Sequence, residues 1–493
     1  MDKIGQFINK RLPAGSFGRN VITLMTGTTF AQALLILVAP VLTRLYSPGD
    51  FGIYTLYTSV LSVLAVVACC RYELAIVLPE KDEDAANVLV LSILICFIMA
   101  ILILLLVAFF RTQLANFLDA PELAIWLWFM PLSLIAVGWF QAFNYWSTRR
   151  KQFKRLAVRQ ITQNTVTAAT QIGTGIVCNH GPMGLICGDI LGRMVATARL
   201  GIKIWIDEGK EITKAISVDN LKTQLLEYKQ FPIFSTWATL LNTIANMLPA
   251  LMLGYFFNTS VVGFYALGHR LLALPINLIG ASIGQVFFPK ATEMYRNASV
   301  TDYSLRMYSV LLYIGIIPIL FLMVVGPELF SLIFGSQWLI AGEYARWLGP
   351  WLIFQLASSP ISMLYYVLDK QSLYFIFSLI LLIMRLLALF IGGLLNNPLY
   401  TIMLLGLSGA VVYFINAVFL LKIAGNNLIK ILATTVKPFV LVFPFLVPTI
   451  CFKWLVPESL WSIPICAISG LACVIILGLK QKRMPCNGRG EIC

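Results

Sequence analysis

Long apolar stretches recur through this chain of 493 residues, and they limit its fold more than any other feature. Windows of about 18 or more mostly apolar residues follow one another from Asn20 to Leu479. A helix of about 20 residues crosses the hydrocarbon layer of a bilayer, whereas barrel strands are shorter and alternate in polarity. Lipid offers no hydrogen-bond partners, so backbone in these stretches must be helical. The sequence therefore predicts an all-α polytopic membrane protein.

We expect about fourteen transmembrane helices, each close to the length that a bilayer requires. The composition agrees, because 59% of the residues are hydrophobic and only 12% are charged, against about 25% charged in soluble domains. The expected spans are 20–43, 52–78, 87–110, 123–146, 157–178, 182–204, 233–257, 260–286, 305–326, 347–368, 372–395, 401–423, 437–455 and 460–479.

The net charge of +14 reflects membrane topology and not nucleic-acid binding. With both termini in the cytoplasm, roughly 27 of the 36 Lys and Arg residues fall in cytoplasmic segments, which is the positive-inside distribution. The opposite orientation would violate that rule. The densest cluster between spans comprises Arg149, Arg150, Lys151, Lys154, Arg155 and Arg159.

The chain shows signs of an internal duplication. Several residue pairs recur at one constant offset of 219, namely Trp128 with Trp347, Pro131 with Pro350, Lys151 with Lys370 and Gln152 with Gln371. We expect two pseudo-symmetric lobes of about six helices each around a central cationic cavity, followed by two extra C-terminal helices. The expected limits are 1–205 for the N-terminal lobe, 206–232 for a cytoplasmic connector, 233–425 for the C-terminal lobe, and 426–493 for the appended hairpin with its basic tail.

One apolar stretch, Phe264 to Pro289, contains His269 and Arg270, and Arg270 lies about ten residues after the start of the expected span 260–286. A guanidinium stays charged at physiological pH, so at membrane depth it must face protein or water. The alternative is that the side chain reaches the interface, which suits residues near the end of a span. The depth of Arg270 favours a site for an anionic group.

Other ionisable residues also fall within expected spans: Arg71, Glu73, Asp189, Arg193, Arg199 and Arg385. Asp189 and Arg193 stand four residues apart, which favours a structural ion pair, whereas Arg71 and Glu73 would point to different faces of a helix. For Arg385, a structural partner and a cavity-lining role stay open. Arginines outnumber acids, which predicts an electropositive interior for an anionic substrate such as a phosphate.

Motifs for enzymatic energy conversion are missing from the sequence. There is no Gly-rich phosphate loop with its lysine, and two histidines with scattered cysteines show no metal-ligand spacing. We therefore expect a protein that is not an enzyme, with no cofactor and no metal, that depends on a gradient or on substrate flux. Glu73 and Asp189 are the acids that could couple transport to an ion or neutralise an arginine.

Several stretches together resemble the multidrug/oligosaccharidyl-lipid/polysaccharide (MOP) flippase superfamily, and within it the Wzx-type O-antigen flippases. They are RLYSPGDFGIY (44–54), RYELAIVLPEKDEDAANVL (71–89), FYALGHRLLALPINLIGASIGQVFFPKATE (264–293) and GSQWLIAGEYARWLGPWL (335–352). Arg270 falls where related lipid II flippases have an arginine in a Y-A-D-R-L-x-x-x-P stretch, with His269 in place of the acid. Arg71 is similar to an arginine in the second span of those relatives.

The resemblance implies a flippase in the bacterial inner membrane that moves undecaprenyl-pyrophosphate-linked oligosaccharide from the cytoplasmic to the periplasmic leaflet by alternating access. The substrate-binding cations would then be Arg270, Arg71, Arg385, Arg193 and His269. Implied partners are membrane lipid, the lipid-linked substrate, a polysaccharide polymerase and a chain-length regulator. The extra C-terminal helices would form a groove for the polyprenyl tail.

Three other functions remain open, and one of them is a scaffold for a polysaccharide assembly complex. A drug or cation antiporter of the same superfamily would display unpaired acids in its cavity, and here the acids are outnumbered. A multi-span polysaccharide polymerase or ligase would carry a large outer loop with catalytic Arg or His residues, and the expected outer loops are all short.

Overall fold

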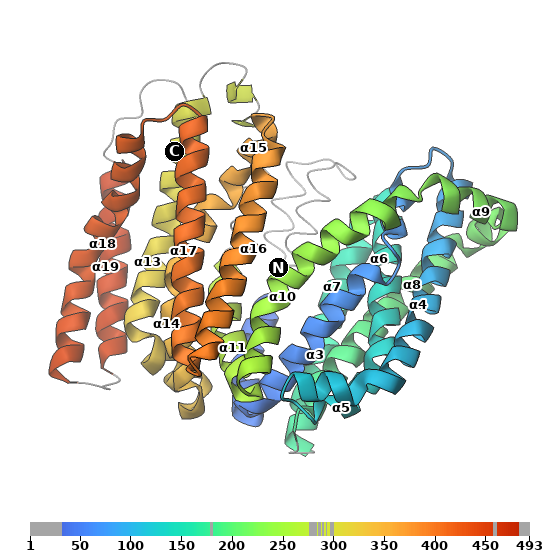
Figure 1. The fold of residues 1–493 in the computed structure, drawn as a ribbon, viewed down its shortest axis with the longest axis horizontal. Coiled ribbons are helices and arrows are strands. Elements are labelled where there is room, and N and C mark those ends of the chain that lie inside the picture. Colours follow the sequence, from blue (N-terminus) through green and yellow to red (C-terminus); the bar gives the residue numbers. More distant parts are fainter. Residues whose placement is uncertain are drawn as a thin grey trace, which may run out of the picture. The chain divides into compact units, whose positions relative to one another are not determined.

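The computed structural model describes residues 32–177, 181–275, 300–456 and 461–482, together with 283, 287, 290, 291 and 293–295. This part of the chain is helical throughout and contains no β-strand (Figure 1). It divides into two compact units, Met1–Gly263 (unit 1) and Phe264–Cys493 (unit 2). The start of the first expected span, Cys178, most of the segment from 276 to 299 and the basic tail after 482 lie outside the described residues.

Unit 1 begins with the helix Gln32–Leu45. It continues with α3 (Pro48–Val67), η1 (Tyr72–Val77), α4 (Asp82–Phe117), α5 (Leu123–Trp126), η2 (Leu127–Phe129), α6 (Met130–Arg149), α7 (Phe153–Val177), α8 (Met183–Ala215), α9 (Val218–Glu227), η3 (Phe231–Ser235) and α10 (Thr236–Phe256). Helix α11 (Thr259–Pro275) contains the boundary between the units.

Unit 2 contains α13 (Val300–Phe334), η5 (Ser336–Trp338), α14 (Leu339–Ser358), η6 (Pro360–Met363), α15 (Leu364–Val367), α16 (Gln371–Leu394), α17 (Pro398–Ile423), α18 (Leu428–Leu455) and α19 (Ser462–Lys482). Every one of the expected spans coincides with a described helix, at least in part. Within the described residues, eight helices are long and apolar enough to cross a membrane. The expectation of an all-α polytopic membrane protein is confirmed.

Local sequence signals fix several helix starts. Ser47 accepts a hydrogen bond from the backbone N–H of Asp50, whose carboxylate in turn accepts from the N–H of Ser47, so α3 begins in a complete capping box. Asn397 and Asn427 cap α17 and α18 through their side-chain oxygens. These caps satisfy amide groups that lipid could not satisfy.

The two units repeat one packing scheme. In unit 1, α4 packs on α6, α6 on α8, and α7 on α8. In unit 2, α13 packs on α14, α14 on α17, and α16 on α17. The turns match as well, because left-handed residues occur at Asp119, Lys151 and Gly181 in unit 1 and at Gly335, Asp369 and Asn396 in unit 2. Offsets of 216, 218 and 215 residues between these turns support the duplication inferred from sequence.

The second expected span, 52–78, is too long. Helix α3 ends at Val67, and the chain then turns through Cys70 and Arg71, which have φ angles of 48° and 64°, into the 3₁₀ helix η1. The sequence stays apolar through this turn, and hydropathy alone cannot distinguish an apolar 3₁₀ segment from the end of a transmembrane helix. Arg71 and Glu73 therefore lie in a connector and not within a span.

Near a proline inside α13, basic residues from two other helices donate hydrogen bonds to backbone carbonyls. Pro327 has no N–H, so the Met323 carbonyl loses its partner in the helix. Arg346 of α14 donates from Nε to that carbonyl at 2.7 Å. Lys453 of α18 donates to the Val324 carbonyl at 2.7 Å and pairs with Glu328 at 2.7 Å. The α18–α19 hairpin is thereby fastened to α13 by charge.

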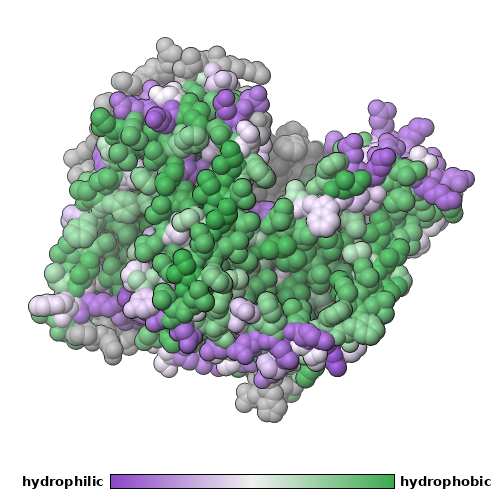
Figure 2. All heavy atoms as spheres, in the orientation of Figure 1, coloured by the Kyte–Doolittle hydropathy of each residue, from purple (hydrophilic) through white to green (hydrophobic). Residues whose placement is uncertain are grey.

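The surface follows the membrane pattern. Apolar side chains cover the flanks of the helices in each unit, and hydrophilic residues gather near helix ends (Figure 2). Exposed residues along α16 show the same composition, with Phe375, Leu379, Ile383 and Leu387 all outward-facing. Such exposed apolar flanks are suited to lipid contact.

Candidate functional site

Arg71 and Glu73 form an ion pair in η1, with Nη1 and Oε1 3.4 Å apart. The expectation that they point to different faces was wrong, because it assumed an α-helix where the chain makes a left-handed turn. The Glu73 side chain is only 1% exposed. Its burial raises the pKa of the carboxyl above the ordinary value of 4.5 by more than Arg71 lowers it.

The η1 connector is held by contacts from α6 and α9. Arg149 donates from Nη1 to the carbonyl of Pro79 at 2.6 Å and pairs with Asp82 at 2.9 Å. The hydroxyl of Tyr72 donates to the Leu225 carbonyl in α9 at 2.9 Å. The position of Arg71 thus depends on contacts made far from it in sequence.

Arg193 and Asp189 pair within α8, with Nε and Oδ2 2.7 Å apart. A second guanidinium, that of Arg159 in α7, lies in the same region and lies 3.3 Å over the ring of Phe140. Arg159 is 6% exposed. Sequence reasoning missed it, because it was counted with the basic cluster at the end of the preceding span.

The signal that could have revealed Arg159 is the regular polar face of α7. Arg159, Gln163 and Thr167 follow at intervals of four, so they share one face of the helix. Helix α8 approaches α7 closely through Gly188 and Gly192, where an added Cβ would collide with Gln171 and Thr167 respectively. Both glycines are needed for this contact.

The predicted residues of unit 2 gather around aromatic rings. The His269 ring stacks on Tyr265 at 5.5 Å and lies 5.5 Å from the ring of Trp351. The guanidinium of Arg385, from α16, lies 5.0 Å from the centre of the Trp351 ring. Helices α11, α14 and α16 therefore bring His269 and Arg385 to the same tryptophan.

Arg270 differs from the other predicted cations. Its side chain is exposed, although it lies in the apolar helix α11 next to the partly buried His269. With the residues that the structure describes, it makes no hydrogen bond or ion pair within 4 Å. The structure thus leaves this guanidinium open to a ligand.

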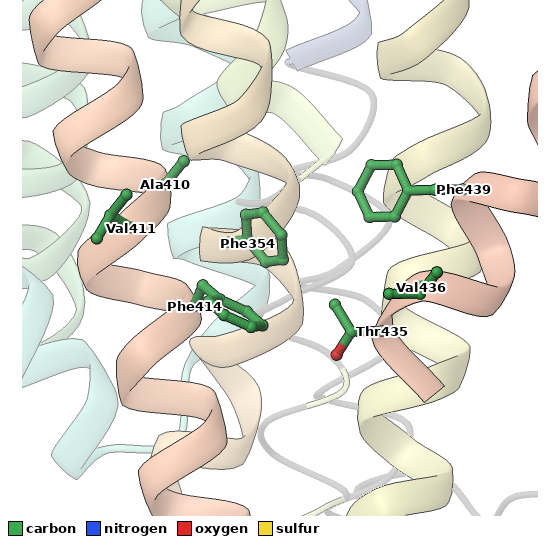
Figure 3. Close-up of a pocket in the computed structure, with 7 residues that line it drawn as sticks. All are labelled: Phe354, Ala410, Val411, Phe414, Thr435, Val436 and Phe439. Atoms are coloured by element: carbon green, nitrogen blue, oxygen red, sulfur yellow. The ribbon is translucent and has the colours of Figure 1, made fainter. Parts of the chain in front are cut away.

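An apolar groove of about 280 Å³ lies in unit 2 between α14, α17 and α18 (Figure 3). Three phenylalanine rings contribute to it, and the side chains in Figure 3 converge on the space between α17 and α18. Its lining residues are Phe354, Ala410, Val411, Phe414, Thr435, Val436 and Phe439. None of them is charged, so this groove could hold hydrocarbon but not an anion.

The basic cluster at the end of α6 is largely neutralised. Glu208 of α8 accepts a hydrogen bond from Nε1 of Trp146 at 2.7 Å and pairs with Arg155 at 2.8 Å and with Arg150 at 3.2 Å. Lys203 and Arg155 hold the pKa of Asp207 below its usual range. This network joins α6, α7 and α8 and offers few free charges.

Metal ligation has no evident place here. Among the described residues, no group of three or more His, Cys, Asp or Glu side chains could hold an ion.

A family profile described as "Polysaccharide biosynthesis protein" matches residues 41–342. The chain belongs to this family. The match includes η1 with Arg71, the α7–α8 pair with Arg159 and Arg193, and α11 with His269 and Arg270. Arg385 lies beyond it.

Comparison with curated proteins finds the teichuronic acid biosynthesis protein TuaB of Bacillus subtilis (strain 168), which is 20% identical over 228 residues. This match covers 46% of the chain and 46% of TuaB, which is about half the length of that relative.

Solved structures match over far more of this polysaccharide biosynthesis protein. Lipid II flippase MurJ in an inward closed conformation matches with a TM-score of 0.71 and 15% identity, covering 94% of this chain and 100% of MurJ. An inward-facing multidrug resistance MATE family transporter of the MOP superfamily matches with a TM-score of 0.63 and 15% identity, covering 80% and 94%. The MOP fold expected from the sequence is confirmed.

Proposed function

We propose that this family member is a flippase for undecaprenyl-pyrophosphate-linked oligosaccharide, moving an O-antigen-type repeat unit from the cytoplasmic to the periplasmic leaflet by alternating access. The family, whose description names polysaccharide biosynthesis, supports the pathway. The fold, shared with a lipid II flippase and a MATE transporter, supports transport over enzymatic polymerisation. A polymerase and a chain-length regulator would be its partners.

The observation that carries the proposal is the contrast between Arg270 and the other cations. Arg71 and Arg193 each have a carboxylate partner, whereas Arg270 has none within the described residues. An exposed, uncompensated guanidinium in an apolar helix is suited to bind pyrophosphate oxygens in bidentate fashion. Arg385 would add positive potential as the substrate passes, and Arg71, Arg193 and His269 are our candidates for further contacts with it.

The drug or cation antiporter is disfavoured for the same reason. It needs an acid that is free to exchange a proton or an ion, and Glu73 and Asp189 are both paired with arginine. We therefore propose that these two acids set the local charge and do not couple ions.

The apolar groove between α14, α17 and α18 is our candidate for the polyprenyl tail. It holds no charge, and the hairpin that forms one wall is fixed to α13 through Lys453. Substituting Ala410 by tryptophan should narrow it and lower transport of long-chain lipids more than of short-chain analogues.

The test of the proposed function is complementation of surface polysaccharide in a flippase-null strain. Arg270→Ala should lower transport about ten- to hundred-fold, since a charge-assisted hydrogen bond contributes roughly 1.5–3 kcal/mol. Arg270→Lys should restore part of it, because lysine keeps the charge and loses the fork. Membrane levels are compared by immunoblot, with Arg199→Ala as the control. Wild-type polysaccharide from Arg270→Ala at normal levels would refute the role of Arg270.

Orientation is tested separately. We propose an inner-membrane protein with both termini in the cytoplasm, from the Lys and Arg distribution. A periplasmic phosphatase fused after Lys482 should be inactive. Activity in that fusion would mean an odd number of crossings.

A further inference from the structure

We propose that unit 1 contains a separate oxyanion site centred on Arg159, on the face of α7 that packs against α8. Its ligand would be one carboxylate- or phosphate-class group. This inference does not depend on the identity of the transported lipid, and it concerns a residue that was not among the candidates predicted from sequence.

The charge balance of this region favours an anion. Arg159 and Arg193 contribute two positive charges, and Asp189, which pairs with Arg193 at 2.7 Å, contributes one negative charge. Arg159 has no acid within 4 Å among the described residues. A buried guanidinium without a counter-ion is costly in a low-dielectric environment, and an incoming anion would remove that cost.

Hydrogen-bonding capacity at the same place is left unused. Arg159 donates from Nη1 to Oε1 of Gln160 at 3.2 Å, but its buried Nε has no acceptor. On the same helical face, Oε1 of Gln163 and Oγ1 of Thr167 are also buried without a partner. Buried polar groups are normally satisfied, and Nε of Arg159 and the hydroxyl of Thr167 can both donate, so these two unsatisfied groups indicate a missing acceptor.

These groups fit an oxyanion chemically. The guanidinium Nε–H and the hydroxyl of Thr167 can both present donors. Phe140 covers one face of the Arg159 guanidinium, and its ring centroid lies 3.3 Å from Cζ of Arg159. The ring fixes the plane of the guanidinium and leaves the N–H groups at the edge of that plane for the ligand.

The source of the oxyanion is either a lipid headgroup or a free anion, and the two can be separated. The purified full-length protein is placed in nanodiscs of phosphatidylcholine or of phosphatidylglycerol, and its melting temperature is followed with sodium phosphate against sodium chloride at equal ionic strength. A ligand that binds only the folded state raises that temperature. A saturable phosphate effect in phosphatidylcholine identifies a free anion, and a higher melting temperature in phosphatidylglycerol alone identifies a headgroup.

The variants are Arg159→Gln and Arg159→Lys, with Arg199→Gln as the matched control on α8. Arg159→Gln should weaken the apparent affinity by about ten- to hundred-fold, and Arg159→Lys by less. Arg199→Gln should behave as wild type. Gel filtration checks that each variant is folded. The proposal is overturned if wild type shows neither effect, or if a folded Arg159→Gln retains it.

Discussion

The two units hold their membrane-depth arginines in different ways. In unit 1, Arg193 pairs with the carboxylate of Asp189, and the connector residue Arg71 pairs with Glu73. In unit 2, Arg385 lies over the indole of Trp351, which also contacts His269. Unit 2 also contains the ion pairs Lys290–Glu293, Arg346–Glu343, Lys430–Asp302 and Lys453–Glu328.

The difference matters because the two solutions leave different amounts of positive charge. A carboxylate cancels a guanidinium, whereas an aromatic ring stabilises it through its quadrupole and leaves the full charge in place. The two units share one packing scheme and differ in the contacts that hold these arginines.

The largest effect should come from removing the indole of unit 2. Trp351 is buried, so Trp351→Ala leaves a cavity and strips the ring from Arg385, and we expect a loss of about 3–5 kcal/mol in unfolding free energy. Trp351→Phe keeps a ring and should cost about 1–2 kcal/mol. Unfolding in SDS titrations measures both. A loss for Trp351→Phe as large as that for Trp351→Ala would show that an aromatic ring at this position gives Arg385 no support.

A smaller loss should follow when the unit 1 pair is broken. Asp189→Asn leaves Arg193 without its carboxylate and should cost about 3 kcal/mol, and adding Arg193→Met should recover most of it. The control is Asp302→Asn, because the Asp302–Lys430 pair is exposed and should contribute less than about 1 kcal/mol. If the double variant is no more stable than Asp189→Asn alone, the pair is not what holds these residues.

The smallest effect concerns pH and Glu73. Burial raises the pKa of Glu73 in the folded state, so the folded protein binds a proton at this carboxyl more tightly than the unfolded chain does. The stabilisation from protonated Glu73 is complete below the ordinary value of 4.5 and is lost as pH rises through the raised pKa. Glu73→Gln should remove this slope from the pH dependence of unfolding. A variant with the wild-type slope would place the titrating group elsewhere.

Helix positions were predictable because hydropathy and span length are strong, local signals. Hydropathy could not show where a helix ends and a turn begins. The apolar sequence after Val67 hides the turn at Cys70 and Arg71, so the Arg71–Glu73 pair was missed. Helices α4 and α8 also run to Phe117 and Ala215, well past the expected ends, because charged residues can continue a helix beyond the bilayer.

The candidate site was predictable only in part. Counting charges identified His269, Arg270 and Arg385, but the contacts of His269 and Arg385 with Trp351 depend on helices far apart in the chain. Arg159 was interpreted as part of the basic cluster that marks the cytoplasmic side, because it follows a run of basic residues. It is buried with its guanidinium over the ring of Phe140 from α6, and only the folded structure reveals that.

Pro327 in α13 has an evolutionary consequence. It leaves the Met323 carbonyl without a donor from the helix, and Arg346 of α14 supplies that donor instead. An ordinary residue at position 327 would return the N–H to the helix, and Arg346 would no longer be needed at that carbonyl. Pro327 and Arg346 should therefore be inherited together, so that chains of this lineage either carry both or lack both.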